Sequence, residues 1–148
     1  MLRQYLVGAA ASVCNIAIHA LVMVTVIRVA RAADELATRY QTFRLIAVMS
    51  ATVTVLMATH LAEVLVWSLI YVIFGVAPEG SDIVYFAFVN YATLGYGDVT
   101  PVVRWHLLGP MTAMNGVLLF GWSTAVIFEV LRMTLLASDE GEKLGWPK

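Results

Sequence analysis

Six consecutive residues carry the most specific chemistry that this chain offers. They are Thr93, Leu94, Gly95, Tyr96, Gly97 and Asp98. Gly95 and Gly97 can adopt positive φ at no steric cost, so the backbone here can alternate between the usual and the left-handed regions. Such alternation turns successive carbonyl oxygens toward one side of the loop, where the hydroxyl of Thr93 can add another oxygen. Oxygens arranged in this way can replace the water around a bare cation.

The segments on either side of the loop decide how its glycines are interpreted. A short, mostly apolar segment precedes the loop, and a run without Asp, Glu, Lys or Arg extends from Arg104 to Glu129 after it. That run is long enough to cross a bilayer, which takes about 20 residues. A type II or I′ turn outside the membrane is the alternative. The flanks favour a loop at membrane depth, where irregular backbone is tolerated only if protein buries it or water lines it.

Composition indicates a membrane protein with helical spans. Hydrophobic residues make up 61% of the chain and charged residues 13%, which is not typical of a soluble domain with one core. The formal net charge is −1, and nothing in the sequence suggests a nucleic-acid partner. Cys14 is the single cysteine, so there is no disulfide framework or zinc pattern. We therefore expect an all-α membrane protein.

Three apolar runs, at residues 5–27, 45–76 and 107–131, predict three transmembrane helices. A cleavable signal peptide is the alternative for the first run. We favour an uncleaved helix, because this run is longer than a signal peptide's apolar region and contains Asn15 and His19. It does not resemble a voltage sensor, because it lacks regularly spaced arginines.

The basic residues predict the orientation in the membrane. Most lie between the first and second runs or after the third, at Arg28, Arg31, Arg39, Arg44, Arg132, Lys143 and Lys148. The connector between those runs also contains Asp34 and Glu35. Positively charged segments stay in the cytoplasm, so we expect the N-terminus outside, the C-terminus inside, and a plasma (inner) membrane location.

The loop resembles the selectivity-filter signature of pore-loop potassium channels. It departs only at Leu94, where valine is commoner. The resemblance continues in register from residues 82–92 through Pro101 and Trp105 to Gly116 and Phe120-Gly121. With the span before the loop, it covers roughly the last two thirds of the chain. It implies a pore helix and a re-entrant loop between the second and third spans. Because one chain carries one loop, it also implies a homotetramer, in which four sets of carbonyls from residues 93–96 bind K⁺.

Residues before the loop predict how it is braced. Ser81 or Asp82 is placed to cap a helix at residues 83–91, which is too short to span the membrane. By the resemblance, Tyr85 can hydrogen-bond to Asp98. Phe86 has no donor to reach the filter tyrosine, and Val89 stands where some relatives have a glutamate.

The third span contains the residues that the resemblance assigns to the cavity and to gating. Val117, Phe120 and Thr124 would face a water-filled cavity. Gly116 aligns with a hinge glycine, and close helix packing remains the alternative role for it. Glu129 can pair with Arg132 three residues later, or four copies of it can form a ring at the inner mouth.

Four polar residues in the first two spans predict an intramembrane polar seam: Asn15, His19, His60 and Glu63. Each pair shares a helix face because its members are three or four residues apart, and antiparallel helices would bring the pairs to similar depths. Three roles remain open for the seam. Interhelical hydrogen bonding is favoured, ahead of pH sensing and a metal site.

These observations predict a potassium-selective channel in which K⁺ is the permeating ion, with membrane lipid as the surrounding partner and no cofactor. A weakly selective cation channel and a non-conducting scaffold or accessory subunit are the alternatives. Enzymatic activity is not expected, because no nucleophile–base pairing is visible. We expect an extra N-terminal span and connector at 1–36, a pore domain at 37–136, and a short cytoplasmic tail at 137–148.

Overall fold

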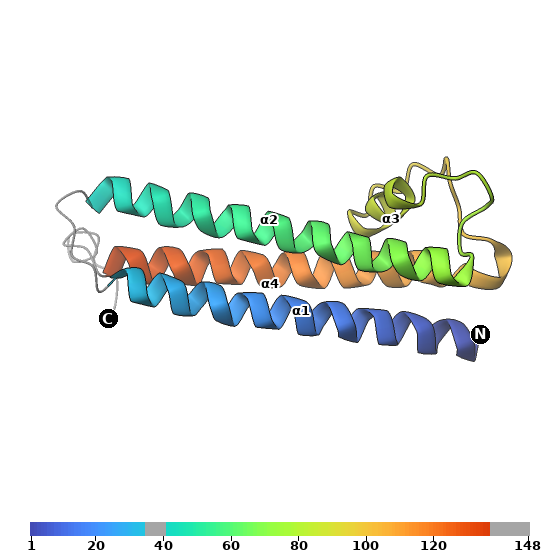
Figure 1. Ribbon diagram of the computed structural model, residues 1–148, viewed down its shortest axis with the longest axis horizontal. Coiled ribbons are helices and arrows are strands. Elements are labelled where there is room, and N and C mark those ends of the chain that lie inside the picture. Colours follow the sequence, from blue (N-terminus) through green and yellow to red (C-terminus); the bar gives the residue numbers. More distant parts are fainter. Residues whose placement is uncertain (35–40, 137–148) are drawn as a thin grey trace. The chain divides into compact units, whose positions relative to one another are not determined.

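The computed structural model describes residues 1–34 and 41–136 (Figure 1). This part of the chain is helical and contains no strand. Its elements are α1 (Leu2–Asp34), α2 (Gln41–Phe74), α3 (Ile83–Tyr91), the short 3-10 helix η1 (Val103–Trp105) and α4 (Leu108–Leu136). The predictions that concern Glu35, Arg39 and the tail from residue 137 lie outside the described residues.

Three of these helices are long and apolar enough to cross a membrane, which confirms the predicted fold class. The apolar stretches are Leu2–Ala32, Thr42–Phe74 and Val103–Leu136. The helices extend beyond most of the predicted limits, which were set by charged residues such as Arg28. Arginine has a high helix propensity, so a charge ends an apolar run without ending a helix. At 1.5 Å per residue, the 33 residues of α1 span about 50 Å, more than the hydrocarbon layer requires.

Helix α3 has the predicted bounds, and its N-terminal cap is Asp82. The Asp82 carboxylate accepts a hydrogen bond from the Tyr85 backbone N–H at 3.0 Å. Such a cap satisfies one of the donors that the first helical turn leaves unpaired. Ser81, the other candidate, precedes the cap.

The chain forms two compact units that each combine segments distant in sequence. Of the described residues, the first unit contains Met1–His19 and Thr59–Gly121, and the second contains residues 20–34, 41–58 and 122–136. Helices α1, α2 and α4 each contribute to both. The loop at residues 93–98 and the predicted polar seam both belong to the first unit.

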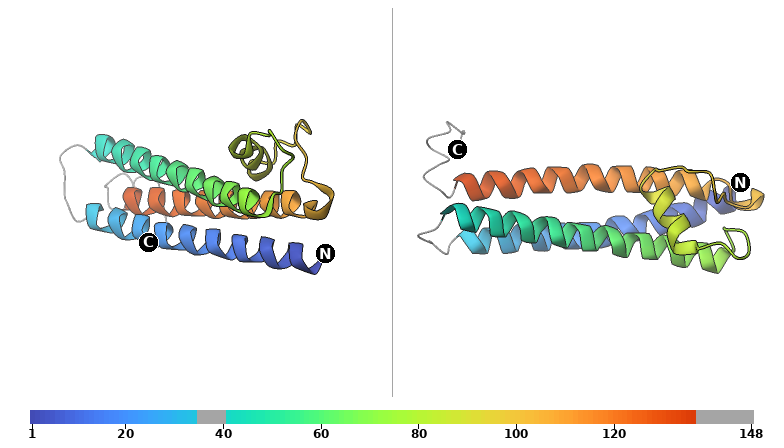
Figure 2. Two further views of the ribbon diagram at one scale, coloured as in Figure 1. Left: turned by 45° about the vertical axis from the view of Figure 1, so that its right-hand side comes forward. Right: turned by 90° about the horizontal axis from the view of Figure 1, so that it is seen from above.

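Aromatic residues form the core of the first unit. Tyr71 of α2 packs against Trp67, with ring centroids 6.2 Å apart, and against Phe86 of α3 at 5.2 Å. Figure 2 shows α3 running across from the end of α2 toward α4. The Val102 N–H donates to the carbonyl of Val76 at 2.8 Å, which ties the segment after the loop to the end of α2. This hydrogen bond joins the two ends of the segment that contains α3.

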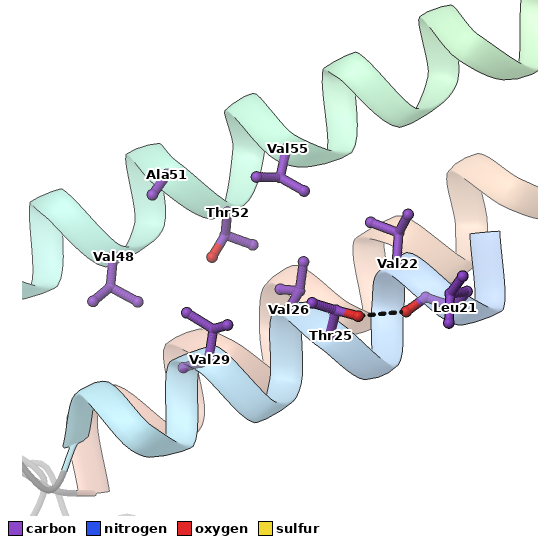
Figure 3. A pocket seen from close by; sticks show the side chains of 10 residues that line it. Leu21, Val22, Thr25, Val26, Val29, Val48, Ala51, Thr52 and Val55 are labelled. Carbon is purple, nitrogen blue, oxygen red and sulfur yellow. Dashed lines mark hydrogen bonds between the residues drawn. The ribbon is translucent and has the colours of Figure 1, made fainter. Parts of the chain in front are cut away.

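The second unit has an aliphatic core and an apolar groove of about 480 Å³ between α1 and α2 (Figure 3). Val48, Ala51, Thr52 and Val55 of α2 face Val22, Val26 and Val29 of α1 in this view. The Thr25 hydroxyl donates to the Leu21 carbonyl at 2.8 Å and so is satisfied within its own helix. The groove therefore offers an apolar lining.

Candidate ion pathway and buried polar cluster

The loop at residues 93–98 has an alternating backbone. Positive φ occurs at Thr93 (60°), Gly95 (58°) and Gly97 (77°), and not at Leu94 or Tyr96 between them. Sequence reasoning placed this conformation at the two glycines but not at Thr93. Successive peptide groups in an alternating backbone can turn their carbonyls to one side of the chain.

Thr93 is held in the left-handed region by the end of α3. The Thr93 N–H donates to Asn90 O at 3.0 Å, and the Leu94 N–H donates to Val89 O at 2.9 Å. These two bonds form a Schellman motif, which closes many helices and usually has glycine where this chain has Thr93. The first residue of the loop is thus also the residue that terminates α3.

The loop has little packing within its own chain. All six residues from 93 to 98 are exposed, including the Leu94 side chain at 50% and the Tyr96 side chain at 66%. A Cβ atom built on Gly95 or Gly97 would meet nothing within 4 Å. Exposed apolar side chains beside an open backbone are typical of a surface that another chain covers.

A side-chain hydrogen bond braces the C-terminal end of the loop. The Tyr85 hydroxyl donates to Asp98 Oδ2 at 2.8 Å, which confirms the predicted pairing. This bond raises the pKa of the Tyr85 phenol above its usual value. Phe86 is buried against Tyr71, and Val89 is buried as well. These two positions fill the core and provide no polar support to the loop.

The four residues of the predicted seam lie together around Glu63. The Glu63 carboxylate accepts hydrogen bonds from His19 Nδ1 at 2.8 Å and from His60 Nδ1 at 3.0 Å. The amide of Asn15 donates to the Glu63 backbone carbonyl at 3.3 Å. Asn15, His19 and Glu63 are fully buried. The geometry therefore joins α1 to α2 through a carboxylate.

Tyr91, which sequence reasoning missed, completes this cluster. Its hydroxyl makes a short hydrogen bond to Glu63 Oε2 and also lies 2.9 Å from His60 Nδ1. Tyr91 is the last residue of α3, two positions before Thr93. We call His19, His60, Glu63 and Tyr91 the Glu63 cluster. It connects α1 and α2 to the end of α3, which leads directly into the loop.

Further polar contacts connect α4 to the same unit. Asn115 Oδ1 accepts from Trp67 Nε1 at 3.0 Å and from Asn15 Nδ2 at 3.2 Å. The hydroxyls of Tyr71 and Thr112 are 2.7 Å apart. Asn15 belongs to the predicted seam, whereas Tyr71 and Thr112 had no signal in the sequence.

Gly116 lies where α4 meets the end of α3. A Cβ atom at this position would overlap the carbonyl oxygen of Tyr91, so glycine permits the close approach of the two backbones. Helix α4 continues through Gly116 without interruption. Of the two roles considered for this glycine, the geometry favours close packing.

The other α4 residues fall in different units. Val117 is exposed, and the Phe120 ring packs against the rings of His60 and Tyr91, with centroids 4.6 and 5.3 Å apart. In the second unit Thr124 is exposed. Glu129 there accepts two hydrogen bonds from the Arg132 guanidinium, at 2.8 and 2.9 Å, which confirms the predicted pair.

Three apolar helices, with a short capped helix and a glycine loop between the second and the third, define a multi-span helical membrane protein. A family model described as "Ion channel" matches residues 59–133, which is just over half of the chain. The chain therefore belongs to this ion channel family, a class of transport protein rather than of enzymes. The match includes α3, the loop and most of α4, and leaves α1 outside. No curated protein and no solved structure matches the chain.

Proposed function

We propose that this protein is a potassium-selective channel whose filter is the backbone of residues 93–98. The observation that carries the proposal is the alternation of positive φ at Thr93, Gly95 and Gly97. In a ring of such loops, the carbonyls of residues 93–96 and the Thr93 hydroxyl would replace the hydration shell of K⁺. Potassium is then the substrate that permeates, and no cofactor is needed.

The proposed channel is a homotetramer with the loops around its central axis, entering the membrane from outside. The exposure of Leu94 and Tyr96 supports this assembly, since neighbouring copies would cover them. The exposed Val117, with Phe120 and Thr124, would line the inner cavity, and Glu129 would lie near its cytoplasmic end. The arginines near the connector support a cytoplasmic C-terminus in a plasma (inner) membrane.

A weakly selective cation channel is the second candidate. It is favoured by the small number of side-chain hydrogen bonds that brace the loop. Tyr85 bonds to Asp98, whereas Phe86 and Val89 are buried in the core and provide no polar support. A filter held by fewer bonds would be freer to adjust to Na⁺. A non-conducting scaffold is the third outcome that an experiment must separate.

Flux from liposomes tests these candidates directly. Purified protein is reconstituted with K⁺ inside, and efflux is compared with that from vesicles loaded with Na⁺. Efflux of K⁺ alone supports the potassium channel, and comparable efflux of both ions supports the weakly selective pore. If correctly folded protein releases neither K⁺ nor Na⁺, the result supports the scaffold and contradicts the proposal.

A further inference from the structure

We propose that His19, His60 and Glu63 form a binding site for a divalent transition-metal ion of the Zn²⁺ class. One ligand atom from each side chain lies within 4.8 Å of the other two. The site joins α1 to α2 beside the end of α3. Metal binding here does not depend on which ion the loop conducts, whereas any effect of the metal on conduction rests on the proposed function.

The separations between the ligand atoms are close to those that a small metal ion requires. Zinc–nitrogen and zinc–carboxylate bonds of about 2.0–2.1 Å place tetrahedral ligands about 3.3 Å apart. The two imidazole Nδ1 atoms lie 2.8 and 3.0 Å from oxygens of the Glu63 carboxylate. The ligand atoms of the two histidines lie within 4.8 Å of each other, so these side chains would move together by up to about 1.5 Å to admit the ion, with water completing the coordination.

The ligand types select the class of ion. Two imidazoles and one carboxylate suit Zn²⁺, Co²⁺ or Ni²⁺, whereas Mg²⁺ and Ca²⁺ prefer oxygen ligands throughout. The site is also chemically unlike the loop, which offers backbone oxygens for a monovalent ion. A metal bound at the Glu63 cluster would thus be distinct from the permeating ion.

Charge gives a reason for a cation at this position. Glu63 is completely buried in a helix that is apolar enough to cross a membrane, where an uncompensated carboxylate is costly. His19, His60 and Tyr91 surround the carboxylate, and none of them is a permanent cation. A divalent ion would more than offset the negative charge of the carboxylate while both histidines remain neutral and act as ligands.

A route to the ligands passes His60. Its side chain is 12% exposed, whereas those of His19 and Glu63 are fully buried. The Phe120 ring covers His60 and is itself 39% exposed. In the proposed channel Phe120 faces the inner cavity, so an ion would enter from that side.

Bound metal would fix the helix that carries the loop. The Tyr91 hydroxyl bonds to the Glu63 carboxylate, and Tyr91 precedes Thr93 by two residues. Replacing the hydrogen bonds between His19 and Glu63 by bonds to a metal would hold α1, α2 and the end of α3 in one arrangement. Tyr91 then acts as a positioning residue that orients the carboxylate.

Binding of Co²⁺ to the full-length protein in detergent tests the site, because the visible spectrum of Co²⁺ reports its ligands. After chelator treatment, the native chain should bind one Co²⁺ per subunit and show absorption bands of tetrahedral Co²⁺. Glu63→Gln and His60→Asn should each weaken binding at least about 100-fold, since loss of even an outer partner costs about 10–100-fold. Tyr91→Phe should weaken it by about tenfold.

His106→Ala is the matched control, because His106 is an exposed histidine outside the Glu63 cluster. It should bind Co²⁺ like the native chain. If Glu63→Gln fails to assemble, the partly exposed His60 variant decides the result. The proposal is overturned if the native chain does not bind Co²⁺. It is also overturned if the His60 and Glu63 variants keep the native affinity for Co²⁺ and the native spectra. Co²⁺ binding without K⁺ flux would refute the channel proposal and leave the metal site standing.

Discussion

The loop at residues 93–98 and the Glu63 cluster lie in the same compact unit but are built in opposite ways. The loop is exposed and offers backbone oxygens, with few contacts to its own chain. The cluster is buried and consists of side chains whose hydrogen bonds come from α1, α2 and α3. A single subunit therefore completes the cluster but not the loop. We infer that the subunit's stability depends on the cluster and that conduction depends on the loop and its assembly.

The substitution with the largest expected effect disrupts the loop and leaves the Glu63 cluster unchanged. Gly97→Ala should reduce K⁺ flux by more than tenfold, because alanine disfavours positive φ by about 1–2 kcal/mol and the proposed tetramer would carry four copies. Gly80→Ala is a matched control, since Gly80 has φ of 79°, Gly97 has 77°, and neither has an atom within 4 Å of a built Cβ. Flux from liposomes measures both. Equal loss of flux in the two variants would show that the effect is not specific to the loop at residues 93–98.

Removing the centre of the cluster should have the largest effect on stability. Glu63→Ala removes the carboxylate to which His19, His60 and Tyr91 all bond inside the protein, and breaking a buried pair in this way costs about 3–5 kcal/mol. Glu129→Ala is the control, because the Glu129–Arg132 pair is about one-third exposed and such pairs contribute about 0–1 kcal/mol. Unfolding by SDS in mixed micelles compares them. Similar midpoints for both variants would contradict the stabilising role of the cluster.

The contact between α3 and α4 should be sensitive to one methyl group. Gly116→Ala places that group against the carbonyl of Tyr91 and should destabilise the protein by about 1–3 kcal/mol. Gly121→Ala adds the same methyl in open space and should be neutral or stabilising by up to about 1 kcal/mol. The same SDS titration measures this difference. A Gly116→Ala protein of native stability would exclude the packing role and favour the hinge.

The smallest effect concerns the bond between Tyr85 and Asp98. Tyr85→Phe should reduce flux modestly, because Asp98 loses a donor while the loop backbone is unchanged. Since the folded pKa of Tyr85 lies above its ordinary value, the bond's contribution is complete below about pH 10 and is lost as pH rises through the folded pKa. Native flux should therefore approach that of Tyr85→Phe only in strong alkali. A difference between them that disappears already near pH 8 would contradict this cause.

The sequence predicted the local features of the fold and the position of the loop. Apolar runs located the three helices, and Asp82 and the glycines located α3 and the loop, because these signals act over a few residues. The positive φ of Thr93 was not predictable in this way, since the closure of α3 imposes it on a residue that rarely adopts it. The same limit applied to Gly116, whose role depends on the distance between two helices.

The Glu63 cluster was predictable only in part for a related reason. Spacing brought His60 and Glu63 to one helix face, and antiparallel helices brought His19 to a similar depth. The contact from Tyr91 crosses 28 residues of sequence, and that between Tyr71 and Thr112 crosses 41. Such contacts follow from the packing of α3 against its neighbours, for which no periodic signal exists in the sequence.

The reversal potential in a planar bilayer, with K⁺ on one side and Na⁺ on the other, tests the central claim most directly. If the carbonyls of residues 93–96 replace the hydration shell of K⁺, the current should reverse near the potassium equilibrium potential, and Gly97→Ala should abolish it. A reversal potential near zero, or an unchanged current in Gly97→Ala, would contradict the account.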